Sequence, residues 1–147
     1  FNWSSLLEPS EPPSSAPAWR VPEAFLAVLF EAATCDGELG RAEHEELLAI
    51  VHRSRALKSL SPEQLAAANI EIVRRLREDD GALAAACAAL PEDMRLPAFA
   101  HALDLVLADG ELSDAEADFL NTLILNLKLN GADVERVADV LVIKNRY

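Results

Sequence analysis

Apolar residues recur every three or four positions along most of this 147-residue chain, which is the spacing of one face of an α-helix. Phe25, Leu29 and Ala33 show the pattern in the first such segment. Strict alternation of apolar and polar residues persists nowhere, so we expect no strand. The pattern therefore predicts an all-α fold of about seven helices, at about residues 22–36, 41–54, 61–77, 80–90, 92–109, 113–129 and 131–141.

Residues with strong positional preferences mark the ends of these helices. Pro22 suits the first turn of a helix, and Ser61 with Gln64 forms a capping-box pattern that opens another. Asp80 is expected to cap the short Ala-rich helix that follows it. Three arginines within residues 74–77 fall in the last turns of the 61–77 helix, where cations complement the helix dipole. We expect a solvated face there.

One acidic octet occurs twice, each time between two predicted helices. Residues 36–43 read DGELGRAE and residues 109–116 read DGELSDAE, so both follow Asp-Gly-Glu-Leu-x-x-Ala-Glu. The octets start 73 residues apart, at 36 and 109, and Leu47 and Ile50 match Leu120 and Leu123 at the same offset. Two copies are fewer than the usual repeat arrays contain. We expect a duplicated helix–turn–helix unit arranged as a pseudo-twofold bundle.

The double motif, carried by CDGELGRAE and LADGELSDAE, resembles the TerB (tellurite-resistance B) family, including the TerB-like domain of some membrane-anchored DnaJ co-chaperones. The resemblance covers roughly Pro22 to Tyr147. It implies an all-helical domain over residues 21–147 and a role in the response to tellurite or other chemical stress. It also implies a cytoplasmic protein that can associate with a membrane through a membrane-embedded partner.

Helix ends explain much of each octet. Gly37 and Gly110 suit the left-handed stop of one helix, and Ser113 with Glu116 forms a capping box for the next. The remaining acids lie near a helix C-terminus, which is the unfavourable end of the helix dipole for a negative charge. Uncompensated like charges in one turn indicate a cation, a basic partner or simple solvation.

We expect any ion site to use the acids of both octets. The candidate ligands are Asp36, Glu38, Glu43, Asp109, Glu111 and Glu116. Hard oxygen ligands favour Ca²⁺ or Mg²⁺. The second half of a calcium EF-hand loop has a similar pattern, but its earlier ligand positions fall on Ala32 and Thr34 in one copy and on Leu105 and Leu107 in the other. A full EF-hand is excluded, and we expect weak binding, on the order of 10⁻⁴ to 10⁻³ M for Ca²⁺.

The alternative is a metal-free protein-interaction module whose acidic turns dock a basic partner. The charge balance, 25 acids against 13 bases for a net charge of −12, suits either hypothesis. It argues against nucleic acid and against direct docking on anionic lipid, which both need clustered Lys and Arg. The longest apolar run, residues 82–90, is shorter than the roughly 20 residues that cross a bilayer, so we expect no transmembrane segment.

Nothing in the sequence favours catalysis. The chain has no Ser-His-Asp order, no phosphate loop and no His-Glu-x-x-His, so we expect no enzyme. Cys35 and Cys87 have the neighbours of small buried hydrophobes. A histidine among carboxylates would allow zinc, but the scattered His44, His52 and His101 are interpreted as structural or solvated.

Residues 1–20 differ from the rest of the chain. They are rich in Pro and Ser and lack a hydrophobic period, which predicts an extended N-terminal arm. The arm either lies on the domain surface or docks a partner. The first residue is Phe1, so upstream residues, including a removed signal or anchor, are left open.

Overall fold

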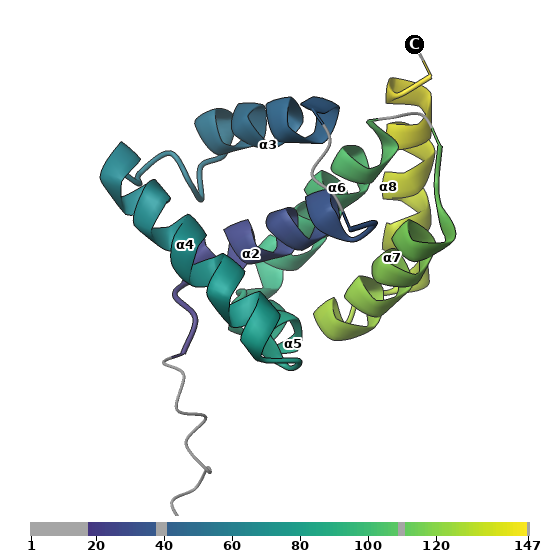
Figure 1. The fold of residues 1–147 in the computed structure, drawn as a ribbon. Coiled ribbons are helices and arrows are strands. Elements are labelled where there is room, and N and C mark those ends of the chain that lie inside the picture. The colour runs from purple at the N-terminus through teal and green to yellow at the C-terminus, as the bar shows by residue number, and fades with distance from the viewer. Residues whose placement is uncertain (1–17, 38–40, 109–110, 147) are drawn as a thin grey trace, which may run out of the picture.

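The computed structural model describes residues 18–37, 41–108 and 111–146, and gives the backbone alone for residues 41–44 and 46. Within these ranges the chain forms helices and no strand, so the all-α prediction is confirmed (Figure 1). The helices are α2 (Val21–Thr34), α3 (Arg41–Arg53), α4 (Pro62–Glu78), α5 (Ala82–Ala89), α6 (Glu92–Leu107), α7 (Asp114–Leu127) and α8 (Gly131–Lys144). The predicted arm lies outside these ranges up to residue 17.

Helix α2 is the centre of the bundle. Eight of its 14 residues are buried, and it packs against α3, α4, α5, α6 and α7 (Figure 1). A helix that is apolar on all sides must be covered on all sides. Its alanines, among them Ala24, Ala27 and Ala33, allow neighbouring helices to approach closely. The sequence of α2 therefore determines its central position.

The two halves of the bundle repeat each other. Helices α2 and α6 end at Thr34 and Leu107, and α3 and α7 begin at Arg41 and Asp114, so both pairs of boundaries are 73 residues apart. The packing is reciprocal: α3 contacts α6 as α7 contacts α2, and α4 contacts α2 as α8 contacts α6. This is the relation that a twofold axis requires. The units α2–α4 and α6–α8 thus have the boundaries and contacts expected of a pseudo-twofold bundle, with α5 as the connecting helix.

The matched apolar positions occupy matched places in the core. Leu47 and Leu120 are both buried, as are Ile50 and Leu123. Burying one such side chain contributes about 1.5–3 kcal/mol relative to leaving it in water. The duplication therefore provides two similar sets of core contacts rather than one core and one appendage.

Most helix starts follow the predicted capping chemistry. Ser61 caps α4, accepting a hydrogen bond from the Gln64 backbone N–H at 3.1 Å while the Gln64 side chain accepts from Ser61 N–H at 2.9 Å. The predicted cap of α5 by Asp80 is wrong. Gly81 is the N-cap residue, and the Asp79 carboxylate accepts a hydrogen bond from the Gly81 N–H at 2.9 Å. The turn therefore uses the first of two adjacent aspartates.

Trp19 extends the core into the stretch that was predicted as arm. Its side chain is 6 % exposed, and its indole N–H donates to the Ala82 carbonyl oxygen at 3.0 Å. The Arg75 guanidinium lies 3.8 Å from the centre of the Trp19 ring, in a cation–π contact. The indole therefore joins the lead-in of α2 to α4 and α5.

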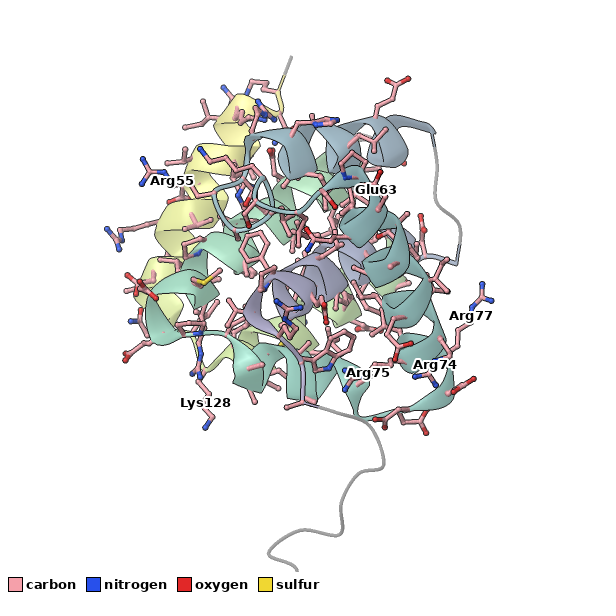
Figure 2. The ribbon with its side chains drawn as sticks, turned by 90° about the vertical axis from the view of Figure 1, so that its left-hand side faces the viewer. Arg55, Glu63, Arg74, Arg75, Arg77 and Lys128 are labelled. Atoms are coloured by element: carbon pink, nitrogen blue, oxygen red, sulfur yellow. The ribbon has the colours of Figure 1, made fainter. Side chains whose placement is uncertain are left out.

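The arginine cluster of α4 is only partly solvated. Arg74 is exposed and pairs with Glu71 and Glu78 on the same helix, and Arg77 points away from the domain (Figure 2). Arg75 is 6 % exposed, which corrects the prediction of a uniformly solvated face. The Trp19 ring covers Arg75, whereas Arg74 and Arg77 are exposed.

Candidate metal site

Three of the six predicted ligands, Asp36, Glu111 and Glu116, have side chains that the structure describes. Asp36 follows Cys35, the C-cap residue of α2, and is exposed, as is Glu111 ahead of α7. Glu38 and Asp109 lie outside the described residues, and so does the side chain of Glu43. Glu116 lies in the first turn of α7.

Glu116 has a structural role that was also predicted. It is 4 % exposed, and one of its carboxylate oxygens accepts from the Ser113 backbone N–H at 2.9 Å. The Ser113 hydroxyl accepts from the Glu116 N–H at 3.1 Å in return, which completes the capping box. The positive end of the helix dipole favours a carboxylate there. Because a carboxylate offers about four acceptor sites, this bond leaves capacity for another donor or a cation.

Gly37 ends α2 in the way that the sequence predicts. Its φ is +100°, in the region that L residues rarely adopt, and its N–H donates to the Thr34 carbonyl oxygen at 2.9 Å. The chain direction changes at this point. Asp36 is therefore presented at the surface immediately before the reversal.

The Cys35 thiol is sensitive to the charges around this turn. Burial is the main reason that its pKa is raised to about 11, and the carboxylates of Glu116 and Asp36 raise the pKa further, Glu116 more strongly. Glu116 thus has a larger effect than Asp36, which is adjacent in the chain. A thiol with this pKa stays protonated near neutral pH, so it is neither a good nucleophile nor a thiolate ligand.

The end of the second octet lies on α7 and the start of the first follows α2, and these two helices pack together. The pseudo-twofold relates this pair to α3 and α6, which also pack together. Among the described acids of the octets, Glu116 and Asp36 both raise the pKa of the Cys35 thiol at the end of α2.

Glu31 is an acid near this turn that the sequence analysis did not select. It is half-buried on α2, and burial raises the pKa of its carboxyl group. Its repeat counterpart, Asp104, accepts from Lys144 Nζ at 3.0 Å and from Asn145 Nδ2 at 2.8 Å. The offset of 73 residues that aligns the octets also matches this pair in the sequence.

The cavity beside Glu31 measures about 380 Å³ and includes Thr34, Gly37 and Arg77 in its wall. It opens next to the first acidic turn. The two turns therefore have different surroundings, even though their sequences repeat. In the first unit the half-buried acid lines a cavity, and in the second it is held by α8.

A complete metal site is not formed by the described side chains alone. Within residues 18–37, 41–108 and 111–146, no group of three or more His, Cys, Asp or Glu side chains is placed to hold an ion. His101 lies on α6 with its ring edge-on to Phe25, their centres 5.7 Å apart, and His52 is exposed. Any site with three carboxylates would need acids at positions 38, 43 or 109.

None of the helices in the described ranges is both long enough and apolar enough to cross a membrane.

Comparison with known proteins identifies one family. Residues 22–139 match the family described as "Tellurite resistance protein TerB". No curated protein and no solved structure gave a match. The matched region contains both octets and all of α3 to α7. Since the match covers most of its length, the chain belongs to the TerB family.

Proposed function

We propose that this TerB domain is a non-enzymatic module that binds divalent cations, Ca²⁺ or Mg²⁺, weakly at its acidic turns. The observation that supports the proposal is the recurrence of the acidic turn at matched helix ends, with Asp36 exposed after α2 and Glu111 exposed ahead of α7. Like charges within one turn repel one another. A bound divalent cation relieves that repulsion, and oxygen ligands suit both of these ions.

The proposed biological role is a part in the response to tellurite or other chemical stress. It rests on the description of the family. A non-enzymatic role is supported by the Cys35 thiol, whose pKa of about 11 keeps it protonated. A net charge of −12 also makes the domain a natural ligand for cations.

The test is an NMR titration of backbone amides with Ca²⁺ and Mg²⁺. Shifts should concentrate at Gly37 and around Glu111, and saturate in the range on the order of 10⁻⁴ to 10⁻³ M. The double variant Asp36→Asn with Asp109→Asn should abolish them. A matched control, Glu63→Gln with Asp80→Asn, removes two exposed acids elsewhere and should leave the titration unchanged.

A second candidate function is a metal-free interaction module that docks a basic protein surface, which could belong to a membrane protein. The capping role of Glu116 favours it, because that carboxylate is explained without an ion. If neither ion moves the turn amides at several millimolar, the cation proposal is refuted and this alternative takes its place.

A further inference from the structure

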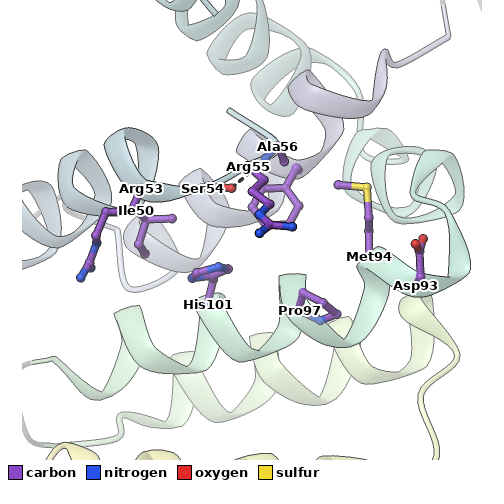
Figure 3. Close-up of a pocket in the computed structure, with 10 residues that line it drawn as sticks. Ile50, Arg53, Ser54, Arg55, Ala56, Asp93, Met94, Pro97 and His101 are labelled. Carbon is purple, nitrogen blue, oxygen red and sulfur yellow. Dashed lines mark hydrogen bonds between the residues drawn. The ribbon is translucent and has the colours of Figure 1, made fainter. Parts of the chain in front are cut away.

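A second cavity lies away from the acidic turns. It measures about 560 Å³, within the range of small-molecule sites (Figure 3). Its walls come from the end of α3, the segment at residues 54–56, the first half of α6 and one residue of α2. The lining residues are Phe25, Ile50, Arg53, Ser54, Arg55, Ala56, Asp93, Met94, Pro97 and His101.

The pseudo-twofold explains why space remains there. Helix α5 packs against α2 and α7. The axis relates that pair to α6 and α3, which are the helices that line the cavity. Among the described helices, α5 has no counterpart on this side. Within the described ranges, α5 fills one of the two equivalent grooves, and no described helix fills the other.

The floor of the open groove is apolar. Phe25 and Ile50 are almost fully buried beneath it, and Met94 and Pro97 from α6 form the opposite wall. The edge-on contact between Phe25 and His101 holds the imidazole at one side. An apolar floor with few polar groups is typical of sites that bind small organic molecules.

The polar groups of the rim are mostly basic. Arg53 is oriented by a hydrogen bond from its Nε to the Ala49 carbonyl oxygen at 3.3 Å. Arg55 lies between the 54–56 segment and α6, over Pro97 and His101 (Figure 3). In a chain with a net charge of −12, the exposed Arg55 brings a guanidinium group to the side of an apolar hollow.

The acid of the rim lies at the other end. Among the described lining residues Asp93 is the one carboxylate, and Figure 3 shows it beyond Met94, away from Arg53 and His101. The groove is thus polarised along its length. An anionic group is attracted at the arginine end and repelled at the Asp93 end, which favours a ligand with a single negative charge.

We infer that this groove binds a small organic monoanion with an apolar body, such as a medium-chain carboxylate. The carboxylate lies against the guanidinium group of Arg55, which is suited to planar bidentate recognition. The hydrocarbon covers Ile50, Met94 and Pro97. This site uses none of the acids of the two octets, so the test of this site and the test of the proposed cation site can fail independently.

The chain provides its own reporter for the test. Met94 is the single methionine of the sequence, so ¹³C-methyl labelling of methionine gives one resonance inside the groove. Titration with octanoate should move this resonance to saturation. Octylamine and octanol, which have the same chain without the negative charge, should give no saturable shift at the same concentrations.

Substitutions then test the charge. Arg55→Gln should raise the Kd for octanoate about tenfold, as expected for the loss of one charged hydrogen-bond donor. Lys58→Gln, an exposed change in the same connecting segment but outside the groove, is the matched control and should leave Kd unchanged. Circular dichroism confirms that each variant is folded.

Three results would overturn the inference. The first is a Met94 resonance that octanoate leaves unmoved at several millimolar. The second is an equal response to octylamine, which would show that only the hydrocarbon is recognised. The third is a loss of affinity in Lys58→Gln equal to that in Arg55→Gln, which would show that the arginine acts only through the net charge of the chain.

Discussion

Replacing Trp19 by alanine should lower the free energy of unfolding by about 3 to 5 kcal/mol, the usual range for removing a large buried aromatic side chain. The side chain is 6 % exposed, although it precedes the first helix. Up to about 2 kcal/mol of the loss comes from the cation–π contact with Arg75, which is also buried. The remainder comes from apolar surface and from the cavity left behind.

A milder change separates the components. Trp19→Phe keeps an aromatic ring near Arg75 but removes the N–H that donates to the Ala82 carbonyl oxygen at 3.0 Å. We expect a loss of about 1 to 2 kcal/mol, the range for a buried hydrogen bond. The order of stability should therefore be wild type, then Trp19→Phe, then Trp19→Ala.

The measurement is urea unfolding followed by far-ultraviolet circular dichroism. The midpoint should fall in both variants, with an unchanged dependence of the free energy on urea. Ile70→Ala is the control, because Ile70 is an exposed apolar residue on α4 and its loss should change stability by no more than about 0.5 kcal/mol. If Trp19→Ala is as mild as this control, residue 19 is not part of the core and the domain begins at α2.

Two further predictions concern protonation. Burial raises the pKa of the Glu31 carboxyl, so the folded state binds this proton more tightly than the unfolded state does. The stability that this proton contributes is present below pH 4.5 and is lost as the pH rises above it. Glu31→Gln should therefore stabilise the domain at pH 7, by no more than about 0.5 kcal/mol because solvent screens a half-exposed charge. This gain in stability should vanish in acid. Thermal unfolding at pH 7 and pH 4 tests the prediction, and an equal gain at both pH values would contradict it. The Cys35 pKa is likewise raised, from 9.0 to about 11, so stability should fall as the pH rises through that interval. Cys35→Ser should reduce this fall, and iodoacetamide should modify Cys35 with a midpoint near pH 11; a midpoint near pH 9 would refute the burial argument.

Local chemistry made much of the fold predictable. The capping boxes at Ser61 and Ser113 join residues only three positions apart, so their pattern is visible in the sequence. The duplication was predictable because Leu47 and Leu120, like the two octets, keep their offset. These signals depend on neighbours in the chain or on comparison of the chain with itself.

What the sequence did not predict depends on distant contacts. Asp79 and Asp80 are chemically identical, and only the backbone geometry of the turn selects Asp79 as the acceptor. Arg75 differs from Arg74 only because Trp19, far away in the sequence, packs on it. Neither distinction has a local signal.

The candidate sites show the same division. The acidic turns were found through their repetition, whereas the open groove was missed because its walls come from four separate segments. Phe25 and Ile50 have the pattern of ordinary core residues, and Arg55 that of an ordinary exposed residue. The two octets suggested that the halves are equivalent, and this concealed the difference that α5 introduces.

That difference has a consequence for the number of binding sites per chain. A twofold rotation exchanges helices in pairs. A helix that connects the two units cannot be mapped onto itself, because the rotation would reverse its chain direction. The described bundle has seven helices, so one of them, the connecting helix α5, has no partner within the described ranges. The acidic octet occurs twice in the sequence, whereas the groove between α3 and α6 is described once. If both proposals hold, cations at the turns bind with a stoichiometry of up to two per chain, and a ligand of this groove with a stoichiometry of one.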